Sequence, residues 1–177
     1  MNEAGTAKAS ANQGETAMKD ASTFKVTTPS DKEIRMTRVF DAPRHLVVDA
    51  FSKPELLKKW LLGPPGWEMV VCNVATKPGE RYRYEWRNTA TGYQFGTGGV
   101  AREISAGRMV HTEVMDGQPG ESLVTTDFVE EGGKTTVTMT LLYESKEIRD
   151  KALKSGMEGG VAASYNRLEE LLASTQA

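Results

Sequence analysis

Apolar and polar residues alternate along much of the chain, which is the pattern of strands that are buried on one face. Residues 33–40 show it most clearly, because Ile34, Met36 and Phe40 share one face and mostly polar residues occupy the other. The pattern also predicts a short strand at 24–28 and six further strands separated by turn signals: 67–75, 80–87, 92–104, 108–115, 121–129 and 134–143. Because these connections are short and contain no helix, we expect consecutive antiparallel hairpins, which excludes a parallel Rossmann-type sheet.

Two short helices are predicted directly after residues 33–40. Asp41 stands where an N-cap would, with Pro43 in the first turn, and both favour a helix start there. Ser52 and Glu55 form a capping-box pattern that opens the second helix. We therefore expect both helices to begin on side-chain caps.

The chain ends in a long amphipathic segment, which we predict as one helix over 146–173 with Ser145 as its N-cap. Gly156, Gly159 and Gly160 interrupt its apolar period, and each costs about 1 kcal/mol relative to Ala in a helix interior. These glycines indicate that something approaches the backbone closely or that the helix bends. The alternative is a break near Gly159.

This order of elements predicts an α+β helix-grip fold, in which a curved antiparallel sheet wraps around the long C-terminal helix. The apolar face of the sheet must be covered, and the terminal helix is the element long enough to cover it. A helix is ~10–12 Å across, whereas six or seven strands at a spacing of ~4.8 Å form a wider surface. We therefore expect sheet and helices to enclose a space that side chains do not fill completely.

A length of 177 residues fits one domain, which we place at 24–177. Residues 1–23 contain no aromatic residue and no apolar run, so we interpret them as a disordered tail, or alternatively as a helical extension that docks on a partner. The tail lacks the apolar stretch of a secretory signal, and no run is long enough to span a membrane. We expect a cytoplasmic protein, monomeric or homodimeric.

The aromatic residues of one strand are the main candidates for a binding site. Tyr82, Tyr84 and Trp86 alternate with charged residues, so strand geometry places the three rings on one face, which we expect to be the concave one. Their rings supply flat apolar area, and the tyrosines add polar tips that can orient a ligand. Further wall residues are predicted on weaker grounds, with plain core packing as the alternative: Trp60, Trp67, Phe95, Met139, Met157 and Tyr165.

His111 and Glu113 form a polar pair two residues apart on one strand, so they share a face. If that face points inward, the two side chains lie in an apolar cavity, where pKa values are displaced. They could then serve acid–base chemistry or anchor a polar group of a ligand. If it points outward, they are a solvated pair without a role, and we assign no catalytic residue.

The remaining signals carry little chemistry. The glycine-rich run 96–99 lies inside a predicted strand with no helix after it, so we interpret it as a bend or bulge and not as a phosphate loop. Cys72 is interpreted as a buried, unreactive thiol. One cysteine and two separated histidines give no zinc spacing, and we expect no metal or cofactor. The formal net charge of -2 gives no general electrostatic reason to bind nucleic acid.

Several segments together resemble the START/Bet v 1-like (SRPBCC) superfamily over roughly residues 33 to 174. Within it, the sequence is most similar to the branch named after the C-terminal domain of the heat-shock-protein ATPase activator. The segments stand in the order of that branch: 38–44, 54–60, 77–79, 99–104, 111–113, 155–160 and 164–168. The resemblance implies a helix-grip fold with a hydrophobic ligand cavity, whereas fold alone does not fix function.

Three functions follow from these observations. The leading one is binding of a small hydrophobic ligand, aromatic or lipid-like, between the sheet and the C-terminal helix. The second is a cofactor-independent enzyme of cyclase, hydrolase or lyase type that uses His111 and Glu113. The third is a stress-response module that contacts a chaperone, although the family's namesake has a further N-terminal domain where this chain has residues 1–23.

Overall fold

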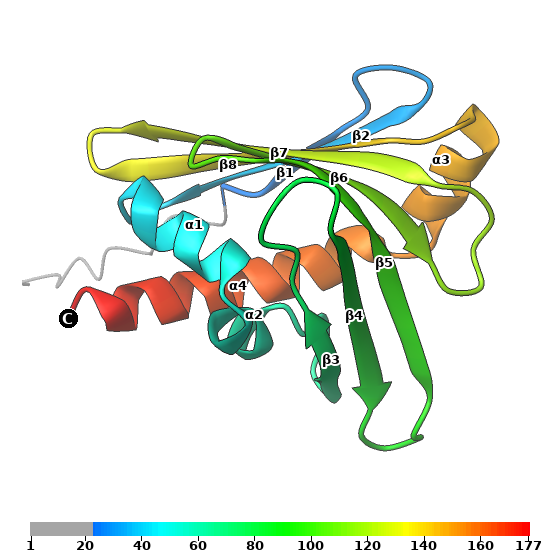
Figure 1. The fold of residues 1–177 in the computed structure, drawn as a ribbon, viewed down its shortest axis with the longest axis horizontal. Helices are drawn as coiled ribbons and strands as arrows, with labels where there is room; N and C mark the ends of the chain where they lie inside the picture. Colours follow the sequence, from blue (N-terminus) through cyan, green and yellow to red (C-terminus); the bar gives the residue numbers. More distant parts are fainter. Residues whose placement is uncertain (1–22) are drawn as a thin grey trace, which may run out of the picture.

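An eight-stranded antiparallel sheet forms the body of the protein in the computed structural model, which describes residues 23–177 (Figure 1). Its order is β1-β2-β8-β7-β6-β5-β4-β3, so β2 pairs with the last strand and the other neighbours are successive hairpins. The strands are β1 (Lys25–Thr27), β2 (Glu33–Phe40), β3 (Trp67–Asn73), β4 (Arg81–Asn88), β5 (Gln94–Ile104), β6 (Arg108–Met115), β7 (Ser122–Glu131) and β8 (Lys134–Leu142). The sequence predicted the hairpins and a strand at each of these eight places, although the expected width of the sheet was based on six or seven strands. Its prediction of a disordered tail over 1–23 falls, except for Thr23, outside the described residues.

Within the described residues, four helices lie on one side of this sheet: α1 (Arg44–Ser52), α2 (Pro54–Trp60), α3 (Lys146–Lys154) and α4 (Met157–Thr175). Figure 1 shows the sheet bending so that β3, β4 and β5 descend beside α2 and α4. This is the α+β helix-grip arrangement that the order of elements predicted.

Both predicted side-chain caps of the short helices are wrong. The N-caps are Pro43 for α1 and Lys53 for α2, and neither makes a side-chain capping hydrogen bond. Ser52 belongs to the last turn of α1, where its hydroxyl donates to the carbonyl oxygen of Val48 at 2.8 Å. Pro54 at the first position of α2 sets the helical φ without needing an amide partner, so this start does not depend on a capping box.

The predicted single helix over 146–173 is also wrong, because two helices replace it. Ser145 caps α3 as predicted, accepting from the Ile148 amide at 3.3 Å. The break lies at Gly156, whose φ of 77° is left-handed, and not at Gly159. A residue in the left-handed conformation ends the series of helical hydrogen bonds. Glycine adopts this conformation without a Cβ penalty.

The glycine-rich run in β5 serves close strand packing, and the bulge that was predicted there as one alternative is absent from it. Residues 94–100 pair regularly with β4, and the register shift lies further on, between Ala101 and Glu103. A Cβ on Gly99 would lie 1.8 Å from the Thr112 carbonyl oxygen of β6. Glycine is therefore required at this position for the two strands to approach.

Two clusters of buried side chains hold the helices on the concave face of the sheet. The larger one joins α1, α2 and α4 to the sheet through residues such as Phe40, Trp60 and Leu168. The smaller one contains Ile34 and Met36 of β2 with residues of β7 and β8. Helices α1, α2 and α4 thus pack on the larger cluster, whereas α3 and the start of α4 pack on the smaller one.

Candidate functional site

A cavity of about 550 Å³ lies between the concave face of the sheet and the helical layer. Its lining includes members of both buried clusters, among them Trp60 and Met36. Residues from β2, β4, β5, β6, β7, β8, α2 and α4 contribute to the wall, and most of their side chains are apolar. Cavities of roughly 300–1,000 Å³ with apolar walls and a few polar groups are typical of small-molecule sites.

A row of aromatic rings along β4 forms one wall. Tyr82, Tyr84 and Trp86 all line the cavity, with ring centroids 5.2 Å apart for the first pair and 6.2 Å for the second. Trp86 stacks on Phe95 of β5 at 5.3 Å, and its indole Nε1 donates to the Leu61 carbonyl oxygen at 2.7 Å. The rings are thus fixed by packing and by a hydrogen bond to the chain after α2.

The charged residues that alternate with these rings lie on the opposite, outer face. The Arg83 guanidinium pairs with Asp116 of the β6–β7 turn and with Glu85 at 2.9 Å. The Arg87 guanidinium pairs with Glu68 of β3 at 2.6 Å. The alternation in the sequence therefore separates an apolar, aromatic inner face from an ion-paired outer face.

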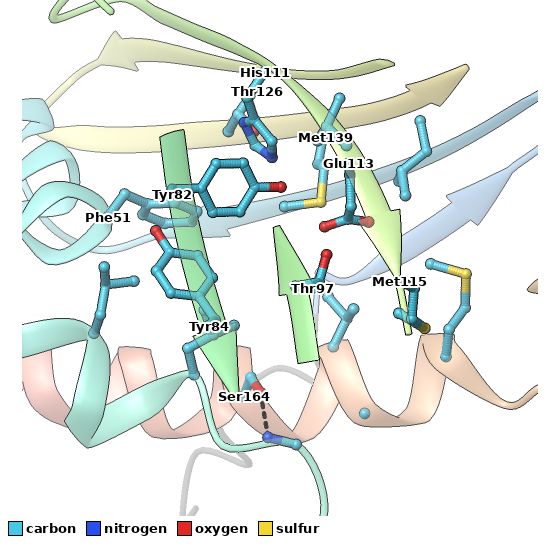
Figure 2. A pocket seen from close by; sticks show the side chains of 18 of the residues that line it. Phe51, Tyr82, Tyr84, Thr97, His111, Glu113, Met115, Thr126, Met139 and Ser164 are labelled. Atoms are coloured by element: carbon cyan, nitrogen blue, oxygen red, sulfur yellow. Dashed lines mark hydrogen bonds between the residues drawn. The ribbon is translucent and has the colours of Figure 1, made fainter. Parts of the chain in front are cut away.

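Polar side chains converge at the part of the cavity formed by β5 and β6. Figure 2 shows the Tyr82 hydroxyl, the Glu113 carboxyl and the Thr97 hydroxyl directed toward the same region, with the His111 ring beside Tyr82. The ring centroids of Tyr82 and His111 are 4.9 Å apart, and the Tyr82 hydroxyl donates to the Thr112 carbonyl oxygen at 3.1 Å. The inward face of β6 is thus the face of His111 and Glu113.

Burial shifts the pKa values of these polar side chains. It lowers the pKa of His111 to about 4, because the charged imidazolium loses its hydration. It raises the pKa of Glu113 for the same reason, and interaction with the Thr97 hydroxyl offsets part of that increase. Burial likewise raises the pKa of Tyr82 and Tyr84, and the nearby Glu113 carboxylate adds to both increases.

The eleven side chains that sequence analysis proposed for ligand contact all line this cavity: Trp60, Trp67, Tyr82, Tyr84, Trp86, Phe95, His111, Glu113, Met139, Met157 and Tyr165. Trp60 and Tyr165 are each 1% exposed, so they support the wall from within the core. That any of these residues contacts a ligand stays a prediction.

Sequence analysis missed other residues of the wall. Thr97 lies within the glycine-rich run that was interpreted as a bend, although its even spacing from Phe95 marks it as inward-facing. Phe51, Thr126 and Ser164 also line the cavity. For Ser164, no signal in the sequence indicated that its hydroxyl accepts from the Gly63 amide at 2.8 Å, which ties the segment after α2 to α4 (Figure 2).

Other candidate chemistry is sparse in the described part of the chain. Residues 23–177 contain no group of three His, Cys, Asp or Glu side chains placed to hold a metal ion. Cys72 is half-buried, and burial raises the pKa of its thiol, with Lys58 opposing that increase. A raised pKa keeps the thiol protonated and unreactive at neutral pH.

The sequence and fold place the protein in a known family. Residues 41–173 match the family model described as activator of Hsp90 ATPase homolog 1-like protein. The chain belongs to this family, which has the SRPBCC-type fold that the sequence predicted. The family's proteins commonly bind hydrophobic ligands. No curated protein matches the chain.

Solved structures from several bacteria share the fold. A protein from Rhodobacter sphaeroides is 28% identical with a TM-score of 0.81, and the match covers 85% of this chain and 98% of that one. A protein from Chromobacterium violaceum is 25% identical with a TM-score of 0.70, over 81% of this chain and 98% of that one. An AHSA1-like protein from Aeromonas hydrophila is 17% identical with a TM-score of 0.64, over 77% and 93% of the two chains.

These comparisons leave chaperone contact, oligomeric state and cellular location as predictions. In the part of the chain that the structure describes, no helix has the length and apolar character needed to cross a membrane.

Proposed function

We propose that the protein binds a small hydrophobic ligand in the cavity between the sheet and α4. The observation that carries this proposal is an interior space of about 550 Å³ beside a row of aromatic rings. A space of this size could hold a molecule of two or three fused or linked rings. Burying its apolar surface would contribute roughly 25 cal/mol per Å² removed from water.

Two features favour a ligand site over imperfect packing. The aromatic wall is fixed from both sides, because Trp86 is held by Phe95 and by the Leu61 carbonyl. The polar groups of Tyr82, Thr97 and Glu113 lie together at one part of the space. An apolar body with a single polar end would match this distribution, since the polar groups fix orientation and the rings supply contact area.

The proposal is tested by titration with N-phenyl-1-naphthylamine, an uncharged fluorophore whose emission rises in apolar surroundings. We expect saturable 1:1 binding by the wild-type protein. The variant V161W places a large ring on the cavity face of α4, so it should lose this binding because the space is filled.

The matched control is E170W, which adds the same ring at an exposed position of the same helix. Circular dichroism and thermal unfolding show whether both variants keep the fold. Equal binding by wild type, V161W and E170W would mean that the fluorophore binds elsewhere, and the proposal would fail.

Acid–base catalysis is a second candidate, favoured by the presence of His111 and Glu113 in one cavity with pKa values displaced in opposite directions. Such a pair could move a proton on a bound substrate without a cofactor. Once a substrate is known, E113Q and H111Q should each abolish turnover while binding persists. Full turnover in both variants would remove this candidate.

A further inference from the structure

The charged residues of the cavity wall are unequally distributed by sign. The described residues that line the cavity include two carboxylates, Glu103 and Glu113, and no Lys or Arg. His111 does not supply the missing positive charge at neutral pH, because burial lowers its pKa to about 4. A ligand carboxylate or phosphate would therefore be buried without a counterion, which is costly.

The two carboxylates are not equivalent. Glu103 is exposed at the end of β5 and already lies 3.7 Å from the guanidinium of Arg108. Glu113 faces the interior, and none of the ion pairs among residues 23–177 includes it. The raised pKa of Glu113 has the same origin, because burial without a cation disfavours its charged form.

The surroundings of Glu113 suit a cation. The Tyr82 hydroxyl points toward it (Figure 2), and its charge raises the pKa of both Tyr82 and Tyr84. The Thr97 hydroxyl interacts with the carboxylate itself. A carboxylate accepts charge-assisted hydrogen bonds from an ammonium group, and hydroxyl oxygens can accept further hydrogen bonds from it. Most of the rest of the wall is apolar, so the cation must carry a hydrophobic body.

We propose that the cavity selects hydrophobic amines, with the ammonium group at Glu113 and the ring system along Tyr82, Tyr84 and Trp86. This inference rests on the proposed function, because it names the head group of the ligand that the cavity holds. In this arrangement the bound amine supplies the cation that the wall lacks, and Glu113 remains ionised in the complex.

The test compares three ligands with the same ring system and different head groups: 1-naphthylmethylamine, 1-naphthylmethanol and 1-naphthoic acid. Their affinities for the full chain are measured by calorimetry near pH 7. We expect the amine to bind about tenfold more tightly than the alcohol, since hydrogen bonds to charged groups are stronger than neutral ones. The acid should bind most weakly.

The variant E113Q should lower the affinity for the amine to that of the alcohol while leaving the alcohol nearly unchanged. The matched control E103Q removes the other carboxylate of the wall and should keep the preference for the amine. Thermal unfolding shows whether both variants fold. If E113Q does not fold, the ranking of the three ligands by the wild-type protein still tests the proposal.

The outcomes separate this inference from the proposed function. Equal affinities, tightest binding of the alcohol or the acid, or an amine preference that survives in E113Q would overturn the inference while leaving hydrophobic ligand binding in place. Failure of all three ligands to bind would overturn the proposed function and this inference with it.

Discussion

At the residue scale, burial shifts the pKa values of His111 and Glu113, both in β6, in opposite directions. His111 has a pKa of about 4 in the folded protein and 6.5 as its ordinary value, so the unfolded chain takes up a proton at a higher pH. Its contribution to stability is present above pH 6.5 and is lost as the pH falls toward 4. For Glu113 the folded pKa is raised, so its contribution is present at low pH and is lost as the pH rises through that value.

This difference predicts how H111Q changes the pH dependence of stability. Between pH 7 and pH 5, the wild-type free energy of unfolding should fall by on the order of 2 kcal/mol more than that of H111Q, which cannot take up the proton. Urea unfolding at a series of pH values measures the difference. The control is H45Q, which replaces an exposed histidine of α1. Parallel curves for wild type and H111Q would contradict the burial of His111.

Sequence patterns identified most of the site at this scale, and the reason is the two-residue period of strands. The alternation around Tyr82 and Trp86 was enough to place both rings on the inner face. The direction of His111 and Glu113 was left open, because the residues on both faces of β6 are partly apolar. The pairing of β6 with β5 and β7 determines which of its faces points inward, and this pairing is a property of the assembled sheet.

At the element scale, the helical C-terminal segment shows what composition alone does not determine. The glycines at 156, 159 and 160 were seen as one interruption, yet they differ in role. Gly156 has a φ of 77° and ends the first helix, whereas a Cβ on Gly159 would meet no atom within 4 Å. Gly160 lines the cavity, and a Cβ on it would make ordinary contact with the Pro64 Cδ at 3.8 Å.

Alanine substitutions should therefore have opposite effects at two of these positions. G159A should raise the free energy of unfolding by roughly 0.5–1 kcal/mol, because alanine stabilises a helix without a clash here. G156A should lower it by roughly 1–2 kcal/mol, because a side chain disfavours the left-handed conformation. Chemical denaturation of both variants measures these changes. Destabilisation by G159A, or no effect of G156A, would show that the segment is arranged differently.

At the scale of the whole molecule, the order of elements and the resemblance predicted the fold, and the geometry of a narrow helix on a wide sheet predicted an unfilled space. What could not be predicted was which polar groups meet in that space. Those depend on how α4 is anchored, for example by Ser164 to Gly63, and on the register that places Thr97 near Glu113. Such contacts join residues far apart in the chain, and local patterns do not encode them.

Methyl NMR of the methionines tests the central claim, that ligands occupy the interior. Five methionines line the cavity, namely Met36, Met109, Met115, Met139 and Met157, whereas Met69 of β3 is not part of its wall. With ¹³C-methyl-labelled protein, saturation with N-phenyl-1-naphthylamine should shift the five cavity resonances because of the ring currents of the bound molecule. Met69 should move least. Unchanged cavity resonances, or shifts confined to Met69, would contradict binding between the sheet and α4.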